Sequence, residues 1–484
     1  MLAKLVGNDV ALPDAAGSLL VSGLTADSRE VEPGFAFAAL AGSKADGAKY
    51  IGQAFERGAS VVIAHENSAY SGPGLVIETA NPRRLFARMA ARFFGKQPDL
   101  TVAVTGTNGK TSVAAFVRQI WLAMGFRAAS IGTIGVVGPA GTEPLVHTTP
   151  DPVQLQKLLA KLAEDHVGHL VLEASSHGLA QYRLDGIRFA AAGFTNLTRD
   201  HLDYHATLQD YLNAKMRLFE ELLPAGAPAV INADTPFSAE VTARAKARGL
   251  KIFSVGKLGV ELKLLSSRRD GFGQQLELQG PHKSHSVYLP LVGDFQASNA
   301  LVAAGLVLAT GGEETLVMHA LESLQGAKGR LDLAGKSKTG ASIFVDYAHT
   351  PDALENAITS LRPYTDGKLV VVFGCGGDRD KGKRPQMGAI AARHADRIIV
   401  TDDNPRSEDA KTIRAEVLAA CPGALEIGDR AKAIAAGVDG LAAGDVLLVA
   451  GKGHEEGQTV GSRVIPFSDH EAVQAAVAGE SYHG

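Results

Sequence analysis

The feature that most restricts the possible fold of this chain is a repeated alternation of short apolar runs with helix-like stretches. After residue 98 the runs have the length and composition of buried strands, as in LTVAVT, HLVL, SIFVDY, KLVVVFG, RIIVTD and DVLLVAG. Strands of this kind that alternate with helices are typical of a mainly parallel sheet, because a parallel pair requires a long crossover connection. The alternation therefore predicts an α/β fold.

Two breaks in the alternation divide the chain into three segments. The first segment has shorter apolar runs and ends in a predicted helix, residues 82–94, which is followed by the linker-like Gly95-Lys96-Gln97-Pro98. The pattern changes again around GRLDL, residues 329–333. A length of 484 residues suits about three domains. We predict a smaller N-terminal α/β domain at 1–97, a central P-loop-type ATP-binding domain with a mainly parallel sheet at 98–330, and a C-terminal Rossmann-like domain at 331–484.

The composition argues against several classes of protein. Forty-eight Lys and Arg against 52 Asp and Glu leave a net charge of -4, so no overall basic field marks a nucleic-acid or membrane-surface binder. Two cysteines, Cys375 and Cys421, are too few for a disulfide framework. No apolar window reaches the length of a membrane span, and polar residues interrupt the N-terminal region where a signal peptide would lie. We expect a cytoplasmic monomer that binds neither nucleic acid nor membrane.

The strongest local motif is a glycine-rich loop between a predicted strand and a predicted helix, Gly106-Thr107-Asn108-Gly109-Lys110-Thr111-Ser112. In this context backbone N–H groups can surround phosphate oxygens, Lys110 can reach the β- and γ-phosphates, and Thr111 or Ser112 can ligate Mg²⁺. The strict pattern GxxxxGK[ST] would place its first glycine at position 104, which is Val104, so this loop is a shortened variant. The alternative is a glycine-rich turn that carries a solvated lysine.

Two further segments could complete a metal–nucleotide site. Glu173 follows the strand-like run HLVL, where a carboxylate can face the phosphates and their Mg²⁺. The segment 196–205, NLTRDHLDYH, concentrates acidic residues and histidines, and His201 could ligate a metal ion through its neutral imidazole. A capping or hydrogen-bonded loop remains the alternative for this segment. Neither HExxH nor paired-cysteine spacing occurs, so we expect no zinc site.

These residues carry a resemblance to a known family. The motifs GTNGKTS, EASSHGL, NLTRDHLDYH, Asn-Ala-Lys at 213–215, GRLD, DYAHTPD, GDRDKGKRP, DNPR and GKGHE occur in the order seen in the Mur ligases. The resemblance covers essentially the whole chain and is weaker in the first segment. The departures are Ser112, where many relatives carry a second threonine, and Gly457, where an aromatic residue is common. The chain is similar above all to the branch that adds meso-diaminopimelate to UDP-N-acetylmuramoyl-L-alanyl-D-glutamate.

The resemblance implies an ATP-dependent ligase of peptidoglycan precursor synthesis, and hence of cell-wall biogenesis, cell shape and cell division. Such a ligase transfers the γ-phosphoryl group of ATP to a substrate carboxylate and lets an amine attack the acyl phosphate. The implied cofactors are ATP and Mg²⁺. Lys110 would act on the phosphates, and Thr111, Glu173, His201 and a carbamoylated Lys215 would hold Mg²⁺. From its sequence context alone, Lys215 would be a solvated helix lysine. The implied nucleotide contacts are Asn299, Arg330 and Asp346.

The resemblance also assigns residues to the two other substrates. Those implied for the UDP-muramoyl dipeptide are Ser28, Ser43, Lys44 and Ala45 in the first segment and Thr148, Thr149, Ser175, Gln181 and Arg183 in the second. A capped turn is the alternative for the Asp27-Ser28-Arg29 segment. Those implied for the amino acid are Arg379, Asp403, Asn404, Pro405, Arg406, Gly451 and Glu455.

Arg406 is the residue predicted to select the amino acid substrate. Meso-diaminopimelate differs from lysine by a carboxylate on its distal carbon, which Arg406 can bind bidentately, whereas Asp403 and Asn404 can bind the distal ammonium. Lysine would leave the guanidinium unpaired, so lysine addition is disfavoured. A purely structural DNPR turn is the alternative. Two other readings stay open, a folylpolyglutamate-synthase-like ligase and a nucleotide-binding module without turnover.

Overall fold

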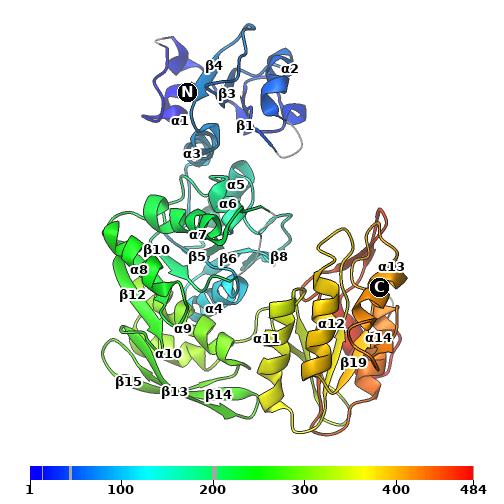
Figure 1. Cartoon of the computed structure of the whole chain (residues 1–484). Helices are drawn as coiled ribbons and strands as arrows, with labels where there is room; N and C mark the ends of the chain where they lie inside the picture. Colours follow the sequence, from blue (N-terminus) through cyan, green and yellow to red (C-terminus); the bar gives the residue numbers. More distant parts are fainter. Residues whose placement is uncertain (14, 43–45, 199–203, 483–484) are drawn as a thin grey trace. The chain divides into compact units, whose positions relative to one another are not determined.

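The computed structural model describes residues 1–13, 15–42, 46–198 and 204–482 (Figure 1). The chain forms two compact units. The first unit comprises Met1–Leu264, Gln279–Ser284 and Leu301–Ala320, and the second comprises Leu265–Leu278, His285–Ala300 and Leu321–Gly484. Each unit contains mostly parallel sheet covered by helices, which confirms the predicted α/β fold class.

The N-terminal part of the first unit is a four-stranded parallel sheet in the order β1-β2-β3-β4. Its strands are β1 Gly23–Thr25, β2 Phe35–Ala38, β3 Val61–His65 and β4 Val76–Thr79, and its helices are α1 Leu2–Val6, α2 Ile51–Glu56 and α3 Pro82–Phe94. Helix α3 has the predicted bounds because both of its ends carry strong signals. The Asn81 side chain caps the first turn, Pro82 occupies the first helical position, and Gly95 follows with a positive φ of 73°.

The central sheet of the first unit surrounds the strand that leads into the glycine-rich loop. The parallel order is β12-β11-β10-β5-β9-β6, and β7 and β8 continue it as antiparallel strands. The strands are β5 Leu100–Thr105, β6 Ala128–Gly132, β7 Gly135–Gly138, β8 Gly141–Glu143, β9 His169–Glu173, β10 Ala191–Phe194, β11 Pro228–Asn232 and β12 Lys251–Gly256. The helices are α4 Lys110–Ala123, α5 Pro152–Glu164, α6 Ser176–Ala180, α7 Leu208–Arg217 and α8 Ser238–Ala247.

Three further strands extend this sheet beyond β12: β13 Leu262–Asp270, β14 Gly273–Gln279 and β15 Ser284–Leu289. They were absent from the sequence prediction. β13 is mostly exposed, and many side chains of β14 and β15 alternate between buried and exposed, so these strands lack the continuous apolar runs that revealed the buried ones. Helices α9 Asp294–Ala309 and α10 Glu314–Leu321 follow.

The second unit contains a six-stranded sheet in the order β16-β17-β21-β18-β19-β20, in which only β16 is antiparallel. The strands are β16 Asp332–Lys336, β17 Ser342–Asp346, β18 Leu369–Phe373, β19 Arg397–Val400, β20 Leu425–Glu426 and β21 Val446–Ala450, and β22 Gly457–Val460 pairs with β23 Arg463–Pro466 as a separate hairpin. The helices are α11 Pro351–Leu361, α12 Lys383–His394, α13 Ala410–Leu418, α14 Arg430–Asp439 and α15 Asp469–Ala478.

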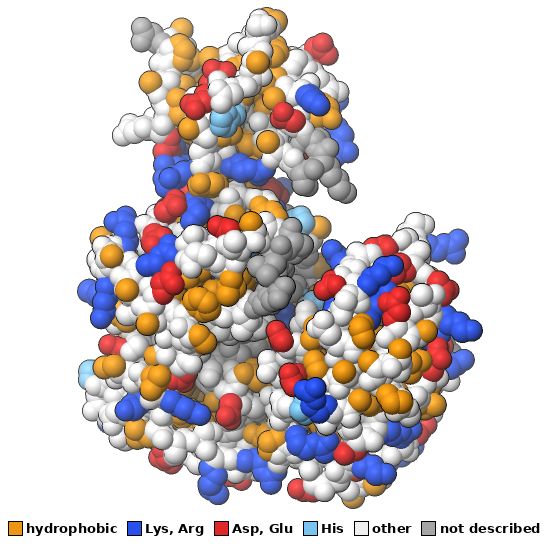
Figure 2. Space-filling model, viewed as in Figure 1, with side chains coloured by type: hydrophobic (Ala, Val, Ile, Leu, Met, Phe, Trp, Pro, Cys, Tyr) orange, Lys and Arg blue, Asp and Glu red, His pale blue; other side chains and the backbone are white. Residues whose placement is uncertain are grey.

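Apolar clusters cover both faces of this sheet, as expected for buried parallel strands. Since β17, β18, β19 and β21 run parallel to one another, their carboxyl ends meet at one edge of the sheet. Ligands bind at this edge in open α/β sheets. On the face drawn in Figure 2, basic and acidic side chains are interspersed. Within the described ranges, no helix is both long and apolar enough for a membrane span.

Candidate active site

The glycine-rich loop lies where it was predicted, between β5 and α4. Gly106 and Gly109 adopt positive φ angles of 148° and 88°, and a Cβ atom on Gly106 would lie 1.9 Å from Oγ1 of Thr195. Only glycine fits at position 106. The Lys110 Nζ donates hydrogen bonds to the carbonyls of Gly106 and Thr107 at 2.9 and 2.8 Å, so the lysine is held against its own loop. Since α4 begins at Lys110, its N-terminal N–H groups favour an anion at this loop.

Thr111 and Glu173 meet at the base of this loop. The Thr111 hydroxyl donates to Oε2 of Glu173 at 3.1 Å, and the N–H of Thr133 donates to Oε1 at 2.8 Å. Glu173 is 2% exposed, and within the described residues no cationic side chain forms an ion pair with it. A buried carboxylate beside a hydroxyl is an oxygen donor set that suits Mg²⁺, which would also supply the missing positive charge. His201, another of the predicted ligands, lies outside the described residues.

Lys215 on α7 is buried beside the same loop. Its side chain is about 1% exposed, its Nζ donates to the carbonyl of Gly106 at 2.7 Å, and it lies 4.1 Å from the centroid of the Tyr211 ring. The reading of Lys215 as a solvated helix lysine is therefore wrong. Its position places an amine next to the residues that would bind ATP phosphates and metal.

The residues predicted for the muramoyl dipeptide form one hydrogen-bonded network. Thr149 Oγ1 donates to the Glu173 carbonyl at 2.9 Å and lies 2.9 Å from Oγ of Ser175. The Arg183 guanidinium donates to the Thr149 carbonyl at 2.6 Å and to Gln181 Oε1 at 2.8 Å. A further contact of 3.1 Å joins the hydroxyls of Thr148 and Thr133. The network runs continuously from the carboxylate at the loop to a basic side chain.

The first unit also has a cavity of about 580 Å³, lined by residues of both its N-terminal and central parts. Asp27, Gln181 and Arg183 line it, together with two cationic side chains that the sequence analysis did not identify, Arg83 and Lys157. No phosphate-binding motif surrounds these two residues, so their position became evident only from the fold. Of the other residues predicted for the UDP substrate, Ser43, Lys44 and Ala45 lie outside the described residues.

The segment around Ser28 forms a short 3-10 helix, Ser28–Glu30. Asp27 caps it by accepting a hydrogen bond from the N–H of Arg29 at 2.9 Å, and the Arg29 side chain holds the pKa of the Asp27 carboxyl at about 2. Ser28 itself is buried. The capped turn, which was the alternative interpretation of this segment, is therefore present. The binding of substrate by Ser28 stays a prediction.

The three residues predicted to contact the nucleotide lie close together in the second unit. Gln296 connects two of them, since its side chain accepts from Asn299 at 3.3 Å and donates to the Arg330 carbonyl at 3.0 Å. Asp346 accepts from the N–H of Leu331 at 2.6 Å, and burial raises the pKa of its carboxyl to about 6. The Nε of Arg330 is buried and has no hydrogen-bond partner among the described residues, as expected if an anionic ligand completes its bonding.

Tyr347 lies next to the residues predicted to contact the nucleotide and was not itself predicted as a site residue. The Arg330 guanidinium lies 4.7 Å from the centroid of its ring, and the His349 ring lies 4.5 Å from it. Burial raises the pKa of the tyrosine hydroxyl and lowers that of the His349 imidazole, so both side chains are neutral near pH 7.

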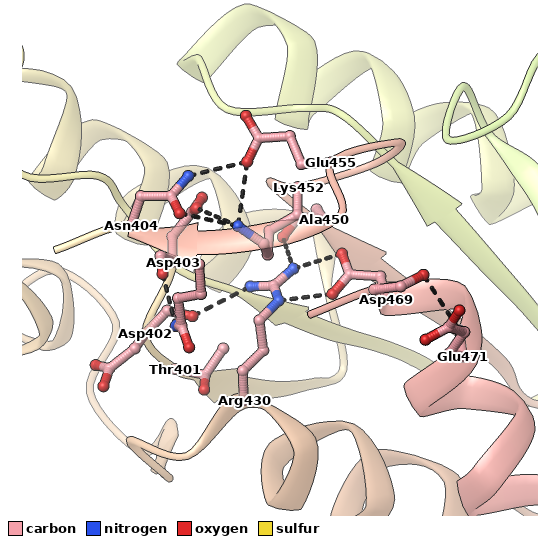
Figure 3. Close-up of polar contacts among 12 residues, drawn as sticks. Thr401, Asp402, Asp403, Asn404, Arg430, Ala450, Lys452, Glu455, Asp469 and Glu471 are labelled. Carbon is pink, nitrogen blue, oxygen red and sulfur yellow. Dashed lines mark hydrogen bonds and ion pairs between the residues drawn. The ribbon is translucent and has the colours of Figure 1, made fainter. Parts of the chain in front are cut away.

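A second polar group of four residues, Asp403, Asn404, Lys452 and Glu455, lies at the carboxyl ends of β19 and β21 (Figure 3). We call it the polar cluster. The Lys452 Nζ donates to Oδ1 of Asn404 at 3.0 Å and to Oε2 of Glu455 at 3.1 Å, and it lies 3.8 Å from Asp403 Oδ1. Asn404 Nδ2 also donates to Oε2 of Glu455 at 2.9 Å. Lys452, which is fully buried, was missed although it lies inside the GKGHE motif.

The other residues predicted for the amino acid surround the polar cluster. Gly451 has a positive φ of 118°, and a Cβ atom there would lie 2.8 Å from Asp403 Oδ2. Arg406 follows the buried Pro405, has a φ of 51°, and donates from Nη1 to the Gly377 carbonyl at 2.8 Å. An arginine held in the left-handed region is strained, and such strain is concentrated at functional sites. Arg379 is exposed on the loop after β18, and within the described residues it makes no hydrogen bond to the polar cluster.

The fold and these groups define an α/β protein with a glycine-rich loop at a helix N-terminus, a metal-compatible carboxylate beside that loop and a separate polar cluster at strand ends. The chain belongs to the Mur ligase family, which confirms the prediction made from its sequence motifs. Residues 20–93 match the Mur ligase family catalytic domain, 104–307 the Mur ligase middle domain, and 329–453 the Mur ligase glutamate ligase domain.

Relatives match the chain along nearly its whole length. It is 57% identical over 464 residues to a protein of Mesorhizobium japonicum and 56% identical over 464 residues to one of Rhizobium meliloti, with 96% of each chain covered in both cases. Both relatives are named UDP-N-acetylmuramoyl-L-alanyl-D-glutamate–2,6-diaminopimelate ligase. A solved structure of a ligase with this name superposes with a TM-score of 0.73 and 32% identity, covering 99% of this chain and 98% of the other.

Proposed function

We propose that this chain is an ATP-dependent ligase that joins meso-diaminopimelate to UDP-N-acetylmuramoyl-L-alanyl-D-glutamate in peptidoglycan precursor synthesis. The observation that carries the proposal is the polar cluster with Arg406 beside it, which offers groups of both signs to a diamino dicarboxylic acid. The names of the near-full-length relatives support the same substrate.

The proposed reaction has two steps, and their atoms balance. The terminal carboxylate of the D-glutamyl residue attacks the γ-phosphorus of ATP, so that ADP leaves and an acyl phosphate forms. The amine of diaminopimelate then attacks the acyl carbon, the C–O bond to phosphate breaks, and the amine loses a proton. The products are an amide, ADP and inorganic phosphate. Phosphoryl transfer of this kind depends on positioning and charge neutralisation more than on covalent chemistry from the protein.

The glycine-rich loop binds and orients ATP in this proposal. The N–H groups of residues 106–112 and the Lys110 ammonium contact the β- and γ-phosphates, which releases Lys110 from the carbonyls it now bonds. Asn299, Arg330 and Asp346 contact the rest of the nucleotide, and the unpartnered Nε of Arg330 gains an acceptor.

The residues that would hold Mg²⁺ in this proposal are Thr111, Glu173, His201 and Lys215. Mg²⁺ bound there would neutralise phosphate charge. Lys215 would take part as a carbamate: its neutral amine adds to the carbon of CO₂ and loses a proton, which gives an anionic ligand. The proximity of its Nζ to the loop carbonyl of Gly106 supports this assignment.

The UDP-muramoyl dipeptide occupies the cavity of the first unit. Ser28 and residues 43–45 contact the uridine diphosphate, and Thr148, Thr149, Ser175, Gln181 and Arg183 contact the muramoyl dipeptide. Arg83 and Lys157 add positive charge to the same cavity, which suits a diphosphate.

The amino acid binds at the polar cluster. Arg406 binds the distal carboxylate, and Asp403, Asn404 and Glu455 bind ammonium groups, with Pro405 and Gly451 shaping the pocket and Arg379 contributing from its loop. Lysine lacks the distal carboxylate and would leave Arg406 without its ionic partner. The protein acts in the cytoplasm as a monomer.

Phosphate release tests the proposed function. Purified protein is incubated with ATP, Mg²⁺ and UDP-N-acetylmuramoyl-L-alanyl-D-glutamate, with either meso-diaminopimelate or L-lysine as the amine. Release with diaminopimelate alone supports the proposal. Equal release with lysine would retain the ligase but refute the proposed selection. No release with either amine from folded, ATP-binding protein would indicate a nucleotide-binding module.

A further inference from the structure

Two buried charged residues lie beneath the polar cluster and belong to none of the groups described above. Arg430 is the first residue of α14, Asp469 is the first residue of α15, and both side chains are 0% exposed. The guanidinium donates from Nε to Oδ1 of Asp469 and from Nη2 to Oδ2, each at 2.7 Å (Figure 3). This is a bidentate ion pair, the geometry in which arginine and a carboxylate fit best.

Two of the three remaining N–H donors of Arg430 bind carbonyls at the ends of neighbouring elements. Nη2 donates to the Ala450 carbonyl at 3.0 Å and Nη1 to the Asp402 carbonyl at 3.4 Å. Ala450 is the last residue of β21 and immediately precedes Gly451, whereas Asp402 immediately precedes Asp403. One planar group thus joins the two loops that carry the polar cluster, because Asp403 and Asn404 follow one carbonyl and Lys452 and Glu455 follow the other.

The surroundings of Gly451 show how close these groups are. A Cβ atom built on Gly451 would lie 2.8 Å from Oδ2 of Asp403 and 3.8 Å from Nη2 of Arg430. The Arg430 guanidinium and the Asp403 carboxylate therefore both lie against the backbone of Gly451. A change in the position of the guanidinium would alter the separation of the two loops.

Stability alone does not account for this ion pair. Removing two charges from water is costly, and well-packed apolar side chains in place of a buried pair are often equally or more stabilising. A guanidinium, however, has five donors in one rigid plane, so it can bind a carboxylate along one edge and carbonyls along the other. An apolar pair could fill the volume but could not fix the distance between the two carbonyls.

We propose that Arg430 and Asp469 are positioning residues that set the separation of the 402–404 and 450–455 loops and thereby determine the affinity for the amino acid. The proposal rests on the proposed function. Neither residue touches substrate, and each acts through the polar cluster.

The primary test is Arg430→Lys, because lysine retains the ion pair with Asp469 but cannot bind both carbonyls. We expect KM for meso-diaminopimelate to rise roughly 10- to 100-fold, the usual effect of losing a group that orients a ligand-binding residue. KM for the UDP substrate should remain within about twofold, since the residues predicted to bind it lie in the first unit. KM for ATP should rise less than KM for diaminopimelate, because the 450–455 loop reaches the nucleotide residues only through the backbone, where the Gly451 N–H donates to the Asp346 carbonyl at 3.0 Å.

A double variant, R430M/D469L, removes both charges together and tests the proposal independently of any folding defect in R430K. It should fold with a melting temperature near that of the wild type and show the same selective rise in KM for diaminopimelate. The control is R362M/D396L, which removes an ion pair of the same unit whose side chains are 39% and 41% exposed. Arg362 and Asp396 form an ion pair of 2.7 Å, and Asp396 precedes β19 at the amino end of the strand, away from the polar cluster.

The outcomes separate this inference from the proposed function. An unchanged KM for diaminopimelate in both R430K and R430M/D469L would overturn it. So would an equal rise in all three KM values in the variants, or the same selective rise for diaminopimelate in R362M/D396L, because either result indicates a general structural role. Inactivity of the wild-type protein would instead refute the proposed function, and the melting temperatures of the variants would be unaffected by that result.

Discussion

The hydroxyl of Thr111 donates a hydrogen bond of 3.1 Å to Oε2 of Glu173, although 62 residues separate them along the chain. The contact arises because β5 and β9 are adjacent parallel strands, with Val104 paired to Glu173, so that the loop after β5 meets the last residue of β9. The sheet topology thus brings together an oxygen pair suited to a hard cation at the glycine-rich loop.

Thr111→Val tests this pair. Valine preserves the shape of threonine but removes the hydroxyl, so we expect kcat/KM to fall on the order of 10- to 100-fold and the Mg²⁺ concentration for half-maximal activity to rise. The measurement is phosphate release during a Mg²⁺ titration. The control is Thr310→Val, since the Thr310 hydroxyl, one residue beyond the end of α9, donates to carbonyls of that helix and, within the described residues, to no other group. An unchanged Mg²⁺ dependence in Thr111→Val would contradict the proposed metal site.

Lys215→Arg tests the carbamate. Arginine keeps a cation next to Gly106 but cannot react with CO₂ to form the anionic ligand, so activity should fall about 100-fold, as for loss of a metal ligand. Carbon-13 NMR of wild-type protein in ¹³C-bicarbonate should give a carbamate signal that is missing from the variant. Lys246→Arg, on the exposed part of α8, should behave as wild type. Full activity of Lys215→Arg would exclude the modification as a requirement.

The raised pKa of the Asp346 carboxyl predicts that the free energy of unfolding depends on pH. Burial raises the pKa of its carboxyl from 3.8 to about 6, against the opposing effects of Arg330 and of hydrogen bonds from Leu331 and Ala348. Because the folded state holds this proton more tightly than the unfolded state, the contribution of the group to stability is complete below pH 4. It is lost as the pH rises through 6.

Asp346→Asn removes this titration and is the direct check. The free energy of unfolding of the wild type relative to Asp346→Asn should decrease between pH 4 and 6 and be constant above pH 7. Urea denaturation of both proteins at four pH values measures the difference, in which the titrations of all other groups largely cancel. A difference that rises with pH would contradict a raised pKa.

Arg406→Ala tests the choice of amino acid. If Arg406 pairs with the distal carboxylate, kcat/KM for meso-diaminopimelate should fall about 100-fold or more, the cost of removing one partner of a desolvated charge pair. With L-lysine, the kcat/KM of the same variant should differ little from that of the wild type. The ratio of kcat/KM for diaminopimelate to kcat/KM for lysine should therefore decrease. Arg393→Ala, at an exposed position on α12, serves as the control. Equal losses with both amino acids would mean that Arg406 does not read the distal carboxylate.

Much of the fold could be predicted because the signals are local. The helix Pro82–Phe94 has its predicted bounds, since apolar spacing and both caps lie within the segment itself. The strands β5, β9, β17, β18, β19 and β21 coincide with continuous apolar runs. Strands β13–β15 were missed because they lack such runs, and their assignment depends on the neighbouring strand with which each one pairs.

The candidate site was predicted unevenly for a related reason. Motifs identified the glycine-rich loop, Glu173 and the DNPR segment, because each is a short stretch with a distinct composition. Tyr347, Arg83 and Lys157 carry no such signal, and Lys452 was overlooked within a motif that had already been noted. Their importance depends on neighbours that are distant in the sequence.

The α/β class, the glycine-rich loop and the membership of a ligase family could be predicted from the amino-acid sequence, since periodicity, turn chemistry and ordered motifs are all properties of contiguous residues. Three features became evident only in the folded chain: Lys215 is buried at the loop, Thr111 meets Glu173, and Arg430, paired with Asp469, donates to carbonyls of two loops. The physical reason is that burial and ion pairing depend on which strand ends lie side by side. That adjacency is set by packing across the whole sheet and cannot be read from any single segment.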